Sequence, residues 1–169
     1  MVVGNNKSRQ ARKSTSRAAL GSSILELPAA MLILFLFIFF PILDIIGVGI
    51  KYGACAALNG LQLHEASLLP KSKATDVGGT VKKGIPDRWL TGGMGAFVNP
   101  SKAPETEVTY RDGENTANGT DKLVNVKTTI QLPPFITSPF IPNIPGLSAP
   151  LNLTVEGERP LENPFNVES

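Results

Sequence analysis

The hydrophobic residues are concentrated in one stretch close to the N-terminus. No charged residue occurs between residues 27 and 43, and beyond Asp44 the apolar pattern continues to Ile50. A membrane-spanning helix needs about 20 predominantly apolar residues, and at about 1.5 Å per residue a helix over 24–50 would be about 40 Å long. The pattern therefore predicts one transmembrane helix with Glu26 and Asp44 near the two interfaces, where a carboxylate costs less than at the bilayer centre.

Three later segments alternate between apolar and polar residues with a period of two. They cover residues 105–111, 124–132 and 151–156. Such alternation is typical of a β-strand with one buried and one exposed face. We expect the three strands to form a small sheet, whose inward face includes Val126, Ile130 and Leu153.

The helical pattern continues beyond the apolar stretch, over residues 51–66. Ala54, Leu58 and Leu61 recur there at helical spacing and form a stripe that the small sheet can cover. Residues 67–104 are rich in proline and glycine and show little periodicity, so we expect a long loop.

These patterns divide the chain into four parts and predict an α+β fold. Residues 1–21 are expected to form a basic cytoplasmic leader, as the charge distribution and the motif described below imply, and residues 22–66 the transmembrane helix with its amphipathic extension. Residues 67–104 are the loop, and residues 105–169 are the small antiparallel β region. The expected architecture is a long N-terminal helix that continues outside the membrane, where the sheet packs on it.

The charges are distributed unevenly along the chain. Residues 1–25 contain five bases and no acid, whereas residues 26–169 contain 11 bases and 14 acids, so the two parts carry +5 and −3 of the net +2. Positive charge beside a membrane span is retained on the cytoplasmic side. We therefore expect a single pass through the cytoplasmic (inner) membrane, with the C-terminal region outside. The five bases are Lys7, Arg9, Arg12, Lys13 and Arg17.

A short motif directly precedes the apolar stretch. It reads Gly21-Ser22-Ser23-Ile24-Leu25-Glu26, and it resembles the processing site of type IV prepilins and pseudopilins. The resemblance implies that a prepilin peptidase cuts after Gly21, which makes Ser22 the first mature residue. It also implies that the Glu26 carboxylate pairs with the amino terminus of a neighbouring subunit and sets the register between packed helices. A carboxylate at the membrane edge is expensive unless it is paired.

Further residues narrow this resemblance to the TadE-like family of tight-adherence pilus assembly proteins. They are Glu26-Leu27-Pro28, Pro41-Ile42-Leu43-Asp44, Gly47, Asn59 and His64-Glu65-Ala66-Ser67. The chain departs from the family pattern where His64 replaces the usual arginine. It also has Leu27 where a tyrosine often follows the first glutamate of Flp-type prepilins. Since some family members remain uncut, cleavage of the leader stays open, while the implied fold is pilin-like.

Candidate chemistry is sparse. One cysteine and one histidine exclude an intramolecular disulfide and a His-rich metal centre. The segment Gly78–Gly84 is rich in glycine and lysine but lacks the spacing of a phosphate-binding loop. No nucleophile is paired with a base, so we expect no enzyme, no cofactor and no metal. The basic N-terminus is expected to serve topology rather than nucleic-acid binding.

These features lead to a main hypothesis and two alternatives. The first is a membrane-anchored, pseudopilin-like component of bacterial pilus assembly or secretion that acts by helix packing. Its expected partners are the membrane, other pilin-like helices or pilus assembly proteins, and a prepilin peptidase. The second is a single-pass envelope protein whose outer domain binds a partner. The third is a secreted or lipid-anchored domain whose signal peptide is removed near Ala54–Ala57.

Overall fold

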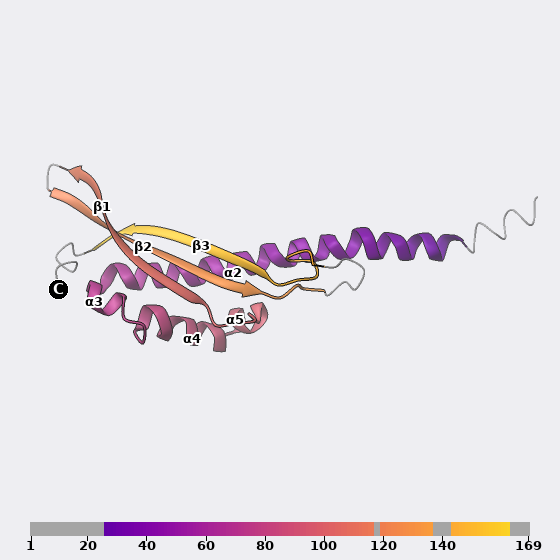
Figure 1. Cartoon of the computed structure of the whole chain (residues 1–169), viewed down its shortest axis with the longest axis horizontal. Helices are drawn as coiled ribbons and strands as arrows, with labels where there is room; N and C mark the ends of the chain where they lie inside the picture. Colours follow the sequence, from indigo (N-terminus) through magenta and orange to yellow (C-terminus); the bar gives the residue numbers. More distant parts are fainter. Residues whose placement is uncertain (1–25, 117–118, 137–142, 163–169) are drawn as a thin grey trace, which may run out of the picture. The chain divides into compact units, whose positions relative to one another are not determined.

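In the computed structural model, residues 26–116, 119–136 and 143–162 are described. The basic leader and the expected cleavage pair, Gly21 and Ser22, lie outside the described residues. The chain forms two compact units, 1–41 and 42–169. Figure 1 shows the order of the elements along the chain.

The described part of the first unit is a helix that leaves most of its side chains exposed and none buried. A π-turn, Phe35–Phe39, interrupts the α-helical hydrogen bonding, and the Phe40 N–H donates to the Phe35 carbonyl. Pro41 explains the interruption, because its ring would collide with the carbonyl four residues earlier, that of Phe37. A π-turn widens the helix at this point and relieves the collision.

Helical structure runs without a break from Glu26 to Leu68, and this helix is long and apolar enough to cross a membrane. Its second part is helix α2, Phe40–Leu68. The predicted long N-terminal apolar helix is therefore confirmed. It ends just before Pro70, where the fixed geometry of proline favours an extended backbone in the preceding residue.

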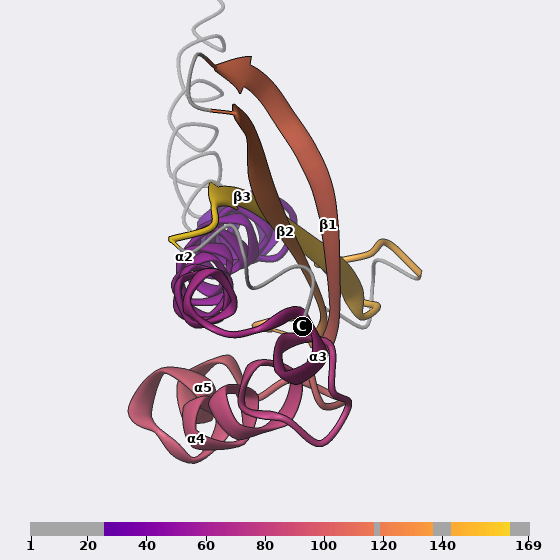
Figure 2. The ribbon, with the colours of Figure 1, turned by 90° about the vertical axis from the view of Figure 1, so that its left-hand side faces the viewer.

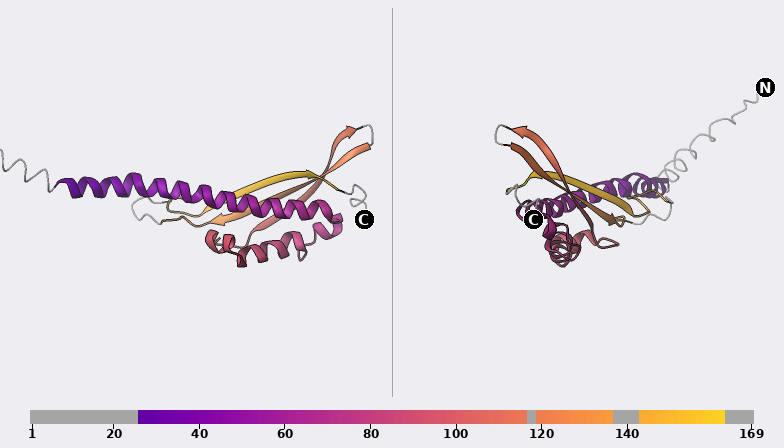
Figure 3. Two further views of the ribbon diagram at one scale, coloured as in Figure 1. Left: turned by 180° about the vertical axis from the view of Figure 1, so that it is seen from behind. Right: turned by 60° about the vertical axis from the view of Figure 1, so that its left-hand side comes forward.

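The second unit contains one antiparallel sheet of three strands, confirming the prediction from alternation. The strands are β1 (Glu105–Thr116), β2 (Gly119–Leu132) and β3 (Leu151–Pro160), in the order β1-β2-β3. Because β3 pairs only with the part of β2 from Leu123 onward, β1 and β2 continue past it as a two-stranded ribbon (Figure 3).

The two faces of the sheet follow the alternation in the sequence, with one set of alternate residues facing the core and the other facing outward. In β2 every second side chain is buried, and the members of this row are Val124, Val126, Thr128, Ile130 and Leu132. On the outer face Arg111 of β1 donates to Glu158 of β3, and this hydrogen bond lowers the pKa of the Glu158 carboxyl. The pair is exposed to solvent, so it contributes little to stability.

The prediction of a loop over residues 67–104 is wrong, because short helices occupy much of this range. They are α3 (Lys71–Ala74), a π-turn (Thr80–Gly84), α4 (Ile85–Thr91) and α5 (Gly93–Val98). Each is too short to show helical periodicity in the sequence. Pro86 stands in the first turn of α4, where a missing N–H does no harm. Tertiary packing then stabilises these turns, since Ile85 and Trp89 are buried in the core.

The core lies between α2, the short helices and the inner face of the sheet (Figure 2). One cluster joins Cys55 and Leu58 of α2 to α4, α5 and the sheet, and includes Trp89, Ile130 and Val155. The other joins Ala66 of α2 to α3, β1 and β2, and includes Ala74, Val108 and Val126.

We predict that Val126→Asp destabilises the protein by about 3–5 kcal/mol, because it buries a charge that has no partner. The matched variant Thr154→Asp adds the same charge on the exposed face of β3 and should change the free energy of unfolding little. Trp89 is the only tryptophan, so its fluorescence in detergent-solubilised protein reports urea unfolding directly. Equal midpoints for the two variants would contradict the assignment of the sheet faces.

Candidate functional site

Helix α2 has two faces that differ in both contacts and chemistry. One face packs against the rest of the second unit and is buried at Asp44, Gly47, Lys51, Cys55, Leu58, Asn59, Gln62, Ala66 and Ser67. The other face is exposed and consists mainly of apolar and small residues. It includes Ile42, Ile45, Ile46, Gly49, Ile50, Gly53, Ala57 and Gly60.

A buried polar network connects the packed face of α2 to all three strands. The Asn59 side-chain amide donates to the Val126 carbonyl (2.9 Å), the Thr128 hydroxyl (3.1 Å) and the Val155 carbonyl (3.3 Å). The Gln62 amide donates to the Val81 carbonyl (2.8 Å) and the Thr106 hydroxyl (2.7 Å).

The Thr128 hydroxyl closes this network. It accepts from Asn59 and donates to the Gln62 Oε1 atom at 2.7 Å. Asn59, Gln62 and Thr128 are each at most 3% exposed. Buried amides are costly when unpaired, so this set of bonds selects one rotation of α2 on the sheet.

Gly157 of β3 makes the close approach of α2 to the sheet sterically feasible. A β-carbon at this position would lie 2.9 Å from the Asn59 Oδ1 atom and 3.0 Å from a methyl carbon of Leu63. Real β-carbons do not approach other atoms so closely, so any larger residue would push the helix away or displace Asn59.

Two charged residues lie on the same packed face, nearer the apolar end of the helix. The Lys51 ammonium donates to the Pro133 carbonyl at 2.9 Å, and the Asp44 carboxylate accepts from the Ile136 N–H at 2.7 Å. Lys51 is 4% and Asp44 1% exposed. Asp44 stays the predicted membrane-interface acid, but the sequence did not reveal that the chain itself covers it.

The predicted apolar stripe on the extension of the helix is partly wrong. Leu58 is fully buried and Ala54 half-buried, but Leu61 is 56% exposed. The reason is that Asn59 and Gln62 are directed toward the sheet, which turns Leu61 to the outside. Hydrophobicity alone could not show this, because the true packed face is polar at two of its central positions.

The exposed face of α2 has an open, nearly flat surface at its glycines. Apart from the neighbouring residues and the nearby backbone of the helix itself, no atom of the described residues lies within 4 Å of a β-carbon added to Gly49, Gly53 or Gly60. Gly49 and Gly53 are four residues apart and thus lie on one side of the helix. In apolar helices, this small-xxx-small spacing allows two backbones to approach closely.

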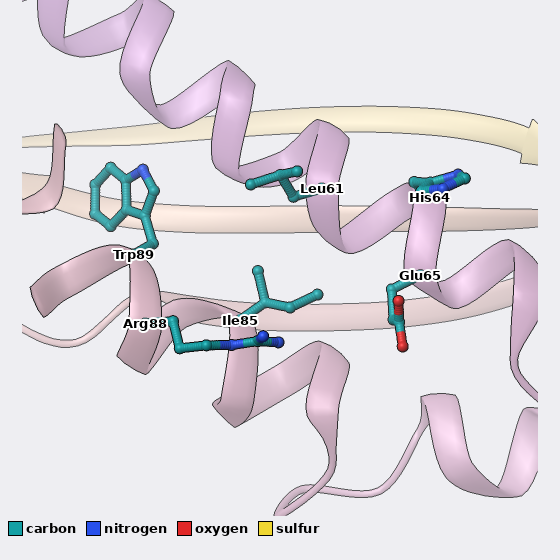
Figure 4. Close-up of a pocket in the computed structure, with 6 residues that line it drawn as sticks. All are labelled: Leu61, His64, Glu65, Ile85, Arg88 and Trp89. Atoms are coloured by element: carbon teal, nitrogen blue, oxygen red, sulfur yellow. The ribbon is translucent and has the colours of Figure 1, made fainter. Parts of the chain in front are cut away.

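A groove of about 370 Å³ separates α2 from α4 (Figure 4). Its lining residues are Leu61, His64, Glu65, Ile85, Arg88 and Trp89. The Trp89 indole N–H has no hydrogen-bond partner among the described residues. His64 does not project freely into the groove, because its Nδ1 atom is 2.9 Å from an Arg159 nitrogen.

The described residues bring no metal-binding cluster together. In the part of the chain that is described, no three His, Cys, Asp or Glu side chains are placed to hold a metal ion. Of the predicted site residues, Glu26 is an exposed residue at the start of the described helix, whereas Gly21 and Ser22 lie outside the described ranges. Sequence reasoning missed Lys51 and Gln62, although polar residues at helical spacing along an apolar helix were the available signal.

Comparisons of the chain with protein-family models, with curated proteins and with solved structures found no match. The most informative feature is the contrast between the two faces of α2.

We predict opposite effects for two glycine-to-alanine substitutions that test this contrast. Gly157→Ala should destabilise the protein by about 1–3 kcal/mol, because the new methyl group overlaps Asn59 and Leu63. Gly60→Ala, on the open face, should stabilise it by about 0.5–1 kcal/mol, since alanine restricts the unfolded chain and favours helix. Urea unfolding followed by Trp89 fluorescence measures both. Similar shifts for the two variants would mean that the packed face has been assigned wrongly.

Proposed function

We propose that this protein is a membrane-anchored, pseudopilin-like component of a bacterial pilus assembly or secretion system of the tight-adherence type, and that it acts by helix packing. The observation that carries the proposal is the exposed face of α2. The sheet and the short helices occupy one side of the helix, while the other side presents Gly49, Gly53 and apolar residues with nothing packed on them among the described residues.

The chemistry of this face suits another apolar helix as its partner. Lipid chains are as apolar as leucine, so helices in a membrane associate through close packing of small residues rather than through the hydrophobic effect. The exposed isoleucines around Gly49 and Gly53 provide contact area, and the glycines allow the approach. The buried positions of Asp44 and Lys51 leave this surface without charge.

Glu26 has a separate role in the proposal. Its exposed carboxylate lies at the start of the apolar helix, where an unpaired charge is unfavourable. After cleavage between Gly21 and Ser22, the amino terminus of a neighbouring helix would supply the partner, and the pair would fix the axial register of the two subunits. The basic leader before the span supports an N-terminus in the cytoplasm.

The packing proposal is tested by Gly53→Leu in native membranes, with the yield of cross-linked species containing this chain as the measurement. Overpacking costs about 1–3 kcal/mol, so the yield should fall by about fivefold or more. Gly93→Leu is the matched control, because a β-carbon added to Gly93 also meets no other atom, but Gly93 belongs to α5 and not to α2. Unchanged cross-linking in Gly53→Leu would refute packing through this face.

The pilin-like part of the proposal has an additional test in the mass of the mature protein. Gly21→Leu should leave the leader attached, because the residue before the cut must be small, whereas Glu26→Ala should be cut normally yet fail to assemble. Mass spectrometry of the purified protein and the same cross-linking assay give the two readings. Two results would together favour a plain membrane anchor. The wild-type protein would retain its leader, and the Glu26→Ala protein would assemble fully.

The groove between α2 and α4 supports a second candidate, an envelope protein whose outer domain binds a partner. Its exposed Leu61 and its lining by Ile85 and Trp89 would suit an apolar side chain of that partner. In this case Leu61→Asp would abolish partner binding, while Gly53→Leu would leave it unchanged.

A further inference from the structure

The described residues of the connection between β2 and β3 lie beside the apolar part of α2 (Figure 1). We refer to its described residues, 133–136 and 143–150, as the collar. A β-carbon added to Gly47 would lie 3.0 Å from the Phe135 Cβ atom, and one added to Gly146 would lie 3.6 Å from a Val48 methyl carbon. The collar therefore contacts the helix within the apolar stretch that continues to Ile50.

The outer surface of the collar is apolar and exposed. Phe135 is 53% and Ile144 44% exposed, and both belong to a sequence, 128–155, that contains no charged residue. A groove of about 170 Å³ lies between helix and collar, lined by Ile45, Val48, Pro145, Gly146, Leu147 and Leu151. The collar thus continues the exposed apolar surface of the helix.

Five of the six backbone N–H groups in residues 143–150 have a hydrogen-bond acceptor within the collar. The N–H groups of Gly146, Leu147, Ser148 and Ala149 donate to carbonyls within the collar, and that of Ile144 donates to the Ser148 hydroxyl. Four of the twelve collar residues are prolines, Pro133, Pro134, Pro145 and Pro150, and carry no N–H at all. In water, N–H groups without a protein partner can hydrogen-bond to solvent. Backbone in contact with hydrocarbon has no such solvent, so its N–H groups must be paired within the protein.

The charges near this surface are turned away from it. The Ile136 N–H donates to the Asp44 carboxylate, and the Pro133 carbonyl accepts from Lys51. Both charged side chains are buried between helix and collar. The collar therefore covers the two charges that would otherwise oppose contact of this part of α2 with lipid.

We propose that the collar is a second membrane-contacting element, and that lipid covers it at the boundary between hydrocarbon and headgroups at the Ile50 end of the apolar stretch. This inference rests on the membrane anchoring in the proposed function but not on pilus assembly. The collar and the helix together would then set how far the outer part of the protein stands from the bilayer.

The test uses the full-length chain in nanodiscs of equal parts phosphatidylcholine and phosphatidylglycerol. An environment-sensitive fluorophore is attached to single cysteines in a Cys55→Ala background, at Phe135→Cys and Ile144→Cys in the collar and at Ile46→Cys on the helix. Val77→Cys and Thr154→Cys are exposed controls away from the collar. Quenching is measured with nitroxide on the lipid acyl chains and with iodide in the water.

We expect the two collar probes to be quenched by lipid nitroxide and protected from iodide, as the Ile46 probe is, and the controls to show the reverse. Collar probes that respond only to iodide, with Ile46 still quenched by lipid, would overturn the inference and leave membrane anchoring intact. Collar probes shielded from both quenchers would overturn it in favour of a covering protein. Failure of lipid to quench Ile46 would refute the anchoring itself.

Discussion

The fold depends on how two amide side chains of α2, Asn59 and Gln62, fit into the sheet. Between them they hydrogen-bond to groups on β1, β2 and β3 and to the Val81 carbonyl before α4. Leaving such a buried amide unpaired would cost about 1–3 kcal/mol. A helix held only by apolar contacts could rotate or slide, whereas this network permits a single rotation and a single axial position.

This rotation determines what the rest of the helix can do. With Asn59 and Gln62 against the sheet, helical periodicity also turns Lys51 and Asp44 toward the protein, where the collar covers them. The opposite side then has mainly apolar and small residues, including the open glycines at positions 49, 53 and 60. Because the polar side chains are turned toward the protein, the other face of α2 is left mainly apolar. This second face is the one available to lipid or to another helix.

The elements with one strong pattern could be predicted from the sequence. The three strands could be predicted because apolar and polar residues alternate along them, as Val126 and Lys127 do. The long helix could be predicted because an uninterrupted apolar run of this length is typical of few elements other than a membrane-spanning helix. The inner row of β2 included Thr128, whose hydroxyl is buried in the network. In these segments local pattern and tertiary packing favour the same structure.

Other features could not be predicted, because they depend on contacts between distant residues. The short helices α4 and α5 form where Ile85, Trp89 and Val98 enter the core, and α3 to α5 are each seven residues or shorter, too short to show a helical period in the sequence. The outward position of Leu61 follows from hydrogen bonds that join residues more than sixty positions apart. The covering of Asp44 likewise required knowing that residue 136 returns to the helix.

The central claim is that the exposed face of α2 is a helix-packing surface. It is tested most directly by photo-cross-linking in native membranes. A photoreactive residue is placed at Gly53 or Ala57 on this face, and at Leu61 or Arg88 beside the groove. Cross-linked peptides are then identified by mass spectrometry. The account predicts adducts from Gly53 and Ala57 to the apolar N-terminal helix of another protein or of a second copy of this chain. Adducts formed only from Leu61 and Arg88, with none from Gly53 or Ala57, would contradict it.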